Sequence, residues 1–144
     1  MTINEAVHLI DNIKPNTYDM PTKIKWLSSL DGNIKKDIID THQNGESIVF
    51  NGYNENTDIS TALLVPAPFD ELYIFYLESK IDYWNGEVRK YNNSNAMFTT
   101  ALEEFSKYYN RMNLPLGGKV KYNGSGTTTT PTTNGIMEIT IEEA

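Results

Sequence analysis

The chain has 144 residues, of which 39% are hydrophobic and 11% aromatic, and it carries no cysteine and a formal net charge of −7. This length suits one domain with its own core. The absence of cysteine excludes a disulfide scaffold, a thiolate zinc site and a cysteine nucleophile. The negative charge argues against binding of DNA or RNA through a basic face.

The first helix is predicted directly after Thr2. Thr2 and Glu5 have the spacing of a capping box, in which two side chains satisfy free backbone N–H groups at a helix start. Lys14-Pro15 ends the pattern, because the residue before proline disfavours helix. Between these signals the apolar residues recur at helical spacing: Ile3, Ala6, Val7, Ile10 and Ile13.

A second helix is expected to begin near Asp19, with Pro21 in its first turn, and to end near Asn44-Gly45. Gly32 lies inside it and weakens it by up to about 1 kcal/mol relative to alanine. Its apolar stripe repeats every three or four residues, through Ile24, Leu27, Leu30, Ile34 and Ile38.

Residues 45–68 lose the helical period. We expect a long ordered loop here, because the segment is too apolar to be a passive linker. Residues 47–50 have the composition of a short strand before the Asn51-Gly52 turn. Four apolar side chains are expected to hold the loop on the core: Ile59, Leu63, Leu64 and Val65.

A third helix follows residues 66–71, with an apolar stripe at Tyr73, Leu77, Ile81, Trp84 and Val88. Asn85-Gly86 is expected to kink it. Further apolar side chains lie on its other faces, which is typical of a central helix or of one shared with another subunit. The candidate subunit-interface residues are Phe75, Tyr76 and Tyr83.

Residues 92–95 are rich in turn and capping side chains and predict the boundary before a fourth helix. Pro115 and Gly117-Gly118 end that helix. We expect the third and fourth helices to form an antiparallel hairpin. The fourth helix should face inward with Phe98, Ala101, Leu102, Phe105, Tyr109 and Met112.

The last thirty residues differ from this helical body, residues 1–114. Residues 115–135 form a Gly/Thr-rich linker. Residues 136–144 form a strand or tail, because their apolar side chains alternate with period two. A lone strand needs a sheet edge, supplied by residues 119–122 or by a partner through strand addition. The candidate partner-binding residues are Ile136, Met137, Ile139 and Ile141. The predicted fold is therefore mainly α: a small four-helix domain with a long loop between helices two and three and a tethered C-terminal strand.

Residues with catalytic or ligand chemistry are few and form no recognisable set. His8 and His42 are the two histidines, and neither has a second histidine at metal spacing. Gly124-Ser125-Gly126 lacks the preceding strand and following helix of a phosphate loop. We therefore predict no catalytic residue, no metal, no cofactor and no enzymatic activity. No apolar run approaches the ~20 residues of a membrane span, and the start lacks the pattern of a signal peptide, which predicts a protein used in the cytoplasm.

Several stretches resemble small proteins encoded in the head–tail gene modules of phages and prophages of Gram-positive bacteria. The resemblance covers roughly residues 1–114, and residues beyond 117 lie outside it. The family is the head–tail connector group, also called adaptors. The stretches that carry the resemblance are Ile24–Ile34, Leu63–Tyr73, Tyr83–Val88, Tyr91–Ser94 and Tyr108–Arg111.

The resemblance implies a virion structural protein, a helical subunit in a homo-oligomeric ring of twelve copies beneath the portal protein. Such a ring extends the DNA channel and presents a platform to the next neck, stopper or tail protein. The implied partners are the portal protein, neighbouring copies and that next protein. Genomic DNA passes through without specific binding, and no membrane is involved. The implied location is the neck of the virion, after assembly in the host bacterial cytoplasm.

Two other functions fit the same residues. The chain could serve as another neck or tail-completion component, one ring further down. It could also be a small acidic regulatory binding module with a host target. The first alternative predicts a different position in the virion, and the second predicts absence from virions.

Overall fold

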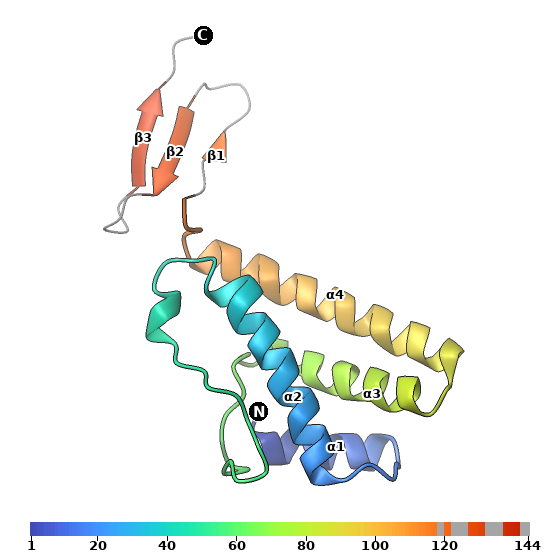
Figure 1. Cartoon of the computed structure of the whole chain (residues 1–144). Helices are drawn as coiled ribbons and strands as arrows, with labels where there is room; N and C mark the ends of the chain where they lie inside the picture. The colour runs from blue at the N-terminus through green and yellow to red at the C-terminus, as the bar shows by residue number, and fades with distance from the viewer. Residues whose placement is uncertain (118–119, 122–126, 132–136, 142–144) are drawn as a thin grey trace.

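A computed structural model describes residues 1–117, 120–121, 127–131 and 137–141 (Figure 1). The protein is mainly α, with four α-helices and a long loop between the second and third, as the sequence predicts. The helices are α1 (Ile3–Ile13), α2 (Met20–Ile34), α3 (Leu72–Trp84) and α4 (Val88–Met112). Short turns of helix are η1 (Lys35–Ile39), η2 (Gly45–Ser47) and η3 (Phe69–Glu71).

The starts of α1 and α2 are confirmed at the predicted residues. The Glu5 N–H donates to the Thr2 hydroxyl at 3.1 Å, and the Thr2 N–H donates to the Glu5 carboxylate at 2.7 Å, which completes the capping box. Asp19 caps α2 by accepting the Thr22 N–H at 3.0 Å. These local side-chain bonds require no tertiary partner, which is why sequence alone locates them.

The second helix ends earlier than predicted. It passes into the π-helical turn η1 and stops at Ile39, before Asn44-Gly45. Asn44 has a left-handed backbone with φ of 64°, and a Cβ on Gly45 would collide with the carbonyl oxygen of Ile39. The chain therefore turns back tightly on the helix end, so Asn44 and Gly45 form this turn and do not end the helix directly.

The loop between η1 and η3 contains no strand at residues 47–50, so that prediction is wrong. A 3-10 turn occupies its first part, and Val49 is 75% exposed. The loop pairs instead with the first residues of the chain: the Ile3 N–H donates to Thr61 O and the Leu63 N–H to Met1 O, both at 3.0 Å. Leu63 and Val65 are buried and Leu64 is half-buried, as expected, whereas Ile59 is exposed.

The boundary between α3 and α4 lies at residues 85–87 and not at the predicted residues 92–95. Gly86 adopts a φ of 74° and reverses the chain, so the expected kink is the end of the helix. Residues 92–95 lie inside α4, where the Ser94 hydroxyl donates to the Asp82 carboxylate at 2.9 Å. A tertiary partner thus stabilises helix through residues whose local preference is for turns. The α3 and α4 helices lie side by side in opposite directions, which confirms the predicted hairpin (Figure 1).

The core lies where α1, α2 and α3 meet, with α4 packed along α3. Tyr73, Leu77 and Ile81 of the predicted α3 stripe are buried, but Trp84 and Val88 are exposed because the helix ends between them. On α4 only Phe105 of the predicted inward residues is fully buried. Met112 is exposed, and the others of that set are half-buried: Phe98, Ala101, Leu102 and Tyr109.

After α4, the chain passes residues 41–43, where the Leu116 N–H donates to Thr41 O at 2.9 Å. Three short strands follow: β1 (Val120–Lys121), β2 (Thr127–Pro131) and β3 (Met137–Ile141). They pair antiparallel in the order β1-β2-β3, with Thr129 opposite both Val120 and Ile139. The β2 residues fall in the segment that sequence assigns to the linker. Ile136 of the predicted strand, and Lys119 and Tyr122 of its expected partner, lie outside the described residues.

Candidate functional site

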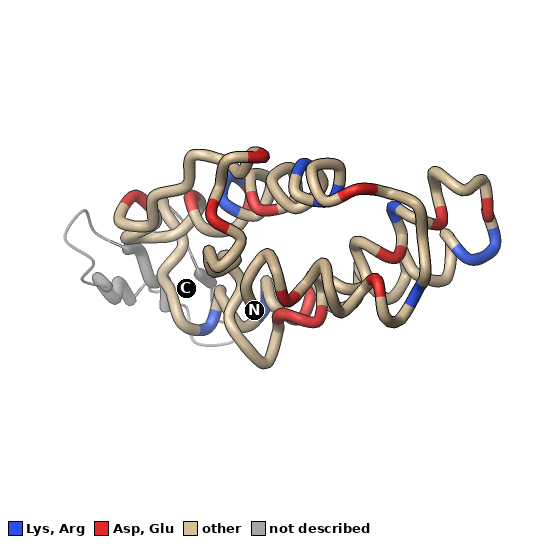
Figure 2. The backbone as a smooth tube through the Cα atoms, turned by 90° about the horizontal axis from the view of Figure 1, so that it is seen from below, with Lys and Arg blue, Asp and Glu red and all other residues tan. Residues whose placement is uncertain are grey.

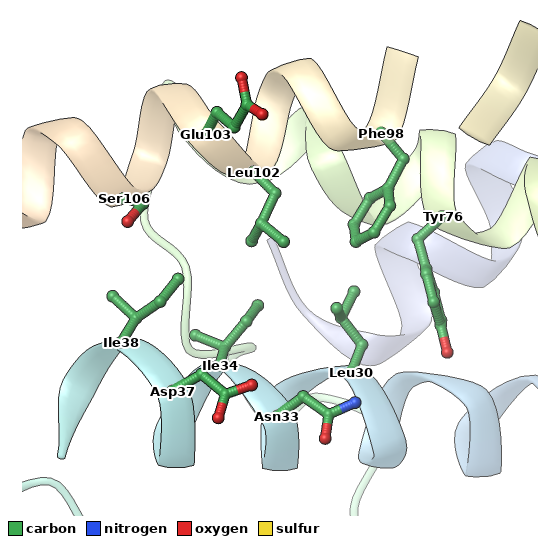
Figure 3. Close-up of a pocket in the computed structure, with 10 residues that line it drawn as sticks. All are labelled: Leu30, Asn33, Ile34, Asp37, Ile38, Tyr76, Phe98, Leu102, Glu103 and Ser106. Atoms are coloured by element: carbon green, nitrogen blue, oxygen red, sulfur yellow. The ribbon is translucent and has the colours of Figure 1, made fainter. Parts of the chain in front are cut away.

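An apolar groove of about 590 Å³ runs between α2 and α4. Leu30 and Ile34 of α2 and Ile38 of η1 form one side, and Figure 3 shows them facing Phe98 and Leu102 of α4 across it. The side chains on the α2 and η1 side are buried, and we call this side the floor of the groove. The α4 side chains Phe98 and Leu102 are half-buried. A groove of this size with an apolar floor is the kind of surface that takes a side chain cluster of a partner.

The margins of the groove carry acidic side chains from both helices. Asp37 lies on the η1 side, and Glu103 lies on the α4 side with its carboxylate turned away from Leu102 (Figure 3). Both are exposed, and within the described part of the chain neither forms an ion pair. Asn33 and Ser106 are the remaining polar residues that line it. The groove therefore offers an apolar floor with negative margins.

A second uncovered surface lies at the turn between α3 and α4. Tyr83 is 56% exposed, Trp84 61% and Val88 69%, and we call these three residues the aromatic tip. The Tyr83 ring contacts those of Trp84 and Tyr91 edge-on, with centroids 5.2 and 5.5 Å apart. Exposed large apolar side chains that cluster, unlike scattered single ones, mark interaction sites.

Basic side chains flank the aromatic tip. Arg89 and Lys90 begin α4 beside Val88, and both are exposed. Lys90 pairs with Glu87 at 3.2 Å, whereas Arg89 forms no ion pair with any described residue. The tip is thus apolar with a free guanidinium at its edge.

A buried carboxylate that sequence reasoning overlooked ties the long loop to the core. Asp31 of α2 is fully buried and accepts hydrogen bonds from the hydroxyls of Tyr73 and Tyr53, each at 2.6 Å, and from the Leu64 N–H at 3.1 Å. Burial raises the pKa of Asp31, against these hydrogen bonds, which lower it. The sequence signal for a buried Asp31 is its position: it follows Leu27 by four residues and therefore falls on the apolar stripe of the helix.

A second buried carboxylate joins α1, α3 and α4. Asp82 forms an ion pair with the Lys14 ammonium and accepts the Ser94 hydroxyl at 2.9 Å. Glu78 lies 3.9 Å from the same ammonium group. A buried charge needs such a partner. Asp82 also lines a hollow with Lys14 and Phe75, but its ion pair and the Ser94 hydroxyl give it a structural role.

The two histidines have different surroundings. His8 is exposed on α1, where its Nδ1 lies 2.9 Å from Asn4 O. His42 is buried, with Nε2 2.6 Å from the Asn110 side chain and its ring edge-on to Tyr109. Among the described residues no three His, Cys, Asp or Glu side chains gather as metal ligands. None of the helices in that part of the chain is long and apolar enough to span a membrane.

The structure brings only two of the predicted interface residues together: Tyr76 and Tyr83 line one hollow, and Phe75 does not. Tyr83 belongs to the aromatic tip, Tyr76 lines the groove and lies 5.2 Å from the Phe98 ring, and half-buried Phe75 lines a separate hollow with Lys14. The structure does not bring these three together as one patch. Three of the predicted partner-binding residues lie on β3, which follows all of these surfaces in the sequence: Met137, Ile139 and Ile141.

Charge is spread over the helical body without a basic face. Figure 2 shows Lys and Arg positions interspersed with Asp and Glu along the backbone. Lys23, which is buried, donates to Asp11 at 2.6 Å, and Lys35 pairs with Asp40. Lys23 and Lys35 are thus used within the protein, which removes them from any phosphate-binding surface.

No protein-family model matches this chain, and comparisons with curated proteins and with solved structures found no similar protein.

Proposed function

We propose that this protein is a structural subunit of a virion neck, a head–tail connector that assembles as a ring below the portal protein. The observation that carries the proposal is the exposed aromatic tip. A small helical body that buries a complete core still leaves Tyr83, Trp84 and Val88 more than half exposed. Surfaces of this kind are covered in assemblies, where tryptophan and tyrosine dominate the binding energy.

The resemblance to connector proteins supplies the identity of the assembly. The resembling stretch Tyr83–Val88 forms the turn that carries the tip. The stretch Ile24–Ile34 contributes the groove residues Leu30 and Ile34. The stretches that carry the resemblance therefore include the turn that carries the tip and the α2 residues of the groove.

The net charge of −7 also suits a ring around a DNA channel. DNA slides through such a channel only if the wall does not hold its phosphates, and a negative wall repels them. In this proposal the genome passes without specific binding. The partners are the portal protein above, neighbouring copies at the sides and a neck, stopper or tail protein below.

The C-terminal segment extends the proposal to strand addition. Residues 136–142 alternate between apolar and polar side chains, with Met137, Ile139 and Ile141 on one face. Because β3 pairs with β2 on one side only among the described strands, its other side can add to a sheet edge of a partner, where backbone hydrogen bonds give affinity and alternate side chains give specificity. We propose that this segment binds a neighbouring neck protein.

Assembly with and without the portal protein tests the proposal. The purified full chain is mixed with portal particles, and the bound mass is measured by size-exclusion chromatography with light scattering. We expect a ring-sized increment on the portal. A chain that stays monomeric and never binds portal particles would contradict the connector proposal.

A variant lacking residues 136–144 tests strand addition. It should keep its helical circular dichroism and bind the next neck protein more weakly; unchanged binding would refute strand addition.

A small acidic binding module is the competing function, and the groove is the observation that favours it, because an apolar floor with acidic margins also suits a basic peptide of a host protein. Mass spectrometry of purified virions distinguishes the two. A connector is present at a fixed copy number per particle, whereas a regulatory module is absent from particles.

A further inference from the structure

The aromatic tip and the groove both expose apolar side chains, and the charged residues beside them have opposite signs. The tip exposes two aromatic rings and Val88 with the cation Arg89 beside them, and the groove has an apolar floor with the anions Asp37 and Glu103 at its margins. None of these three charged side chains forms an ion pair with another described residue. We propose that the tip of one copy inserts into the groove of the next, so that this contact joins neighbouring subunits of the ring. The inference rests on the proposed function and names the surfaces that it uses.

A copy cannot make this contact with itself. Val88 of the tip and Leu102 of the groove stand fourteen residues apart on α4, which separates them by roughly 20 Å along a continuous helix. Because the helix is rigid, its first turn cannot fold back onto its own middle. The contact must therefore join two molecules.

Two different surfaces on one molecule make a heterologous contact. Each copy then offers a tip to one neighbour and a groove to the other, and the chain of contacts closes into a ring when the rotation between copies divides the circle. A self-complementary patch would instead give a closed dimer. The separation of tip and groove on α4 allows such a ring, and the mass of the assembly distinguishes it from a filament or a dimer with exchanged tips.

The charge of the groove margins argues against the C-terminal segment as occupant. That segment carries Glu138, Glu142 and Glu143 and no lysine or arginine. Asp37 and Glu103 would repel it, whereas they attract Arg89 of a second copy. Burial of Trp84 with an arginine at its edge also matches the residue types that dominate interface energetics.

Cysteine cross-linking tests the contact directly, because the natural chain has no cysteine. Two single variants of the full chain, Val88→Cys and Ser106→Cys, are mixed and treated with a short bis-maleimide. We expect a cross-linked dimer from the mixture and none from either variant alone. The control mixture pairs Ser106→Cys with Val49→Cys, which places a cysteine on an exposed loop residue outside both surfaces.

Charge reversal tests the complementarity. Arg89→Glu and Glu103→Arg should each raise the concentration needed for half-assembly by about threefold to tenfold, as expected for an exposed ion pair that becomes repulsive. The double variant should return close to the natural value. Trp84→Ala should raise the half-assembly concentration by about thirtyfold, as for a central interface residue. Val49→Ala should leave this concentration unchanged. Circular dichroism of each variant verifies that the helices are intact.

The outcomes separate this contact from the connector function. Cross-linking in the mixture together with restoration by the double charge variant supports the contact. Another result is a chain that assembles on portal particles, gives no cross-link and shows the same half-assembly concentration after both charge reversals. That result overturns the contact and leaves the connector function standing. A chain that neither cross-links nor binds portal particles overturns both. A cross-link that forms only after loss of residues 136–144 would show that the tail occupies the groove in the full chain, and the proposal would be wrong.

Discussion

The hydroxyl of Tyr73 donates a 2.6 Å hydrogen bond to Asp31 and itself accepts the Val65 N–H at 2.9 Å. This one side chain therefore connects α3, α2 and the end of the long loop in a continuous chain of bonds. Tyr73 and Asp31 are both fully buried. In a fully buried cluster, each bond depends on the others, because any donor left without an acceptor costs its full desolvation energy.

Replacing Asp31 by alanine should lower the free energy of unfolding by about 2–4 kcal/mol, because two tyrosine hydroxyls and the Leu64 N–H lose their shared acceptor. Tyr53→Phe should cost less, about 1 kcal/mol, since its hydroxyl lies closer to solvent. Urea denaturation followed by circular dichroism measures both. Equal losses for the two variants would mean that Asp31 does not organise the cluster.

The stability contributed by Asp31 should depend on pH. Burial raises its pKa above the ordinary value of 3.8, so the folded protein holds this proton more tightly than the unfolded chain does. Stability therefore falls as pH rises from 3.8 through the raised pKa and is constant above it. Compared with Asp31→Asn, the natural protein should gain unfolding free energy as the pH is lowered from about 7 to about 4. The opposite trend would show that the tyrosine hydrogen bonds dominate over burial.

Loss of Lys14 should destabilise the protein through Asp82. The Asp82 side chain is 1% exposed, and Lys14→Ala would leave its charge with the Ser94 hydroxyl alone. Breaking a buried pair costs about 3–5 kcal/mol, and partial access of water to Lys14 places the expected loss near the lower end, about 3 kcal/mol. Ser94→Ala should cost about 1 kcal/mol. Thermal unfolding of the two variants and of the double variant gives the coupling between them, which should differ from zero.

Sequence patterns located the features that depend on neighbours in the chain. The capping box at Thr2 and the cap at Asp19 are bonds within one helical turn, so they appear at the predicted residues. The apolar stripes of α1 and α2 also follow helical spacing. The predictions failed where distant contacts decide. Ser94 stays helical because Asp82 accepts its hydroxyl. In the loop, residues 59–63 and not residues 47–50 pair with the start of the chain.

The candidate surfaces could be predicted only in part. Tyr76 and Tyr83 were identified from excess aromatic character on one helix, and they lie on the groove and on the tip. Trp84 and Val88 were assigned to the core, because a continuous helix through Gly86 would have placed them on the buried stripe. The groove joins residues of α2 and α4 that are distant in sequence, and no spacing rule relates such positions.

The two turn glycines, Gly45 and Gly86, should respond differently to a methyl group. At Gly45 a Cβ would collide with the backbone oxygen of Ile39, which cannot move without disturbing the end of η1. Gly45→Ala should therefore cost about 2–3 kcal/mol. At Gly86 the surrounding space is open, but the φ of 74° disfavours a side chain, so Gly86→Ala should cost about 1–2 kcal/mol.

Substitution by asparagine separates the two causes, because asparagine tolerates a left-handed backbone. Gly86→Asn should recover most of the unfolding free energy lost in Gly86→Ala, whereas Gly45→Asn should be at least as destabilised as Gly45→Ala. Equal recovery at both positions in urea denaturation would show that backbone conformation, and not the close approach to Ile39, requires glycine at residue 45.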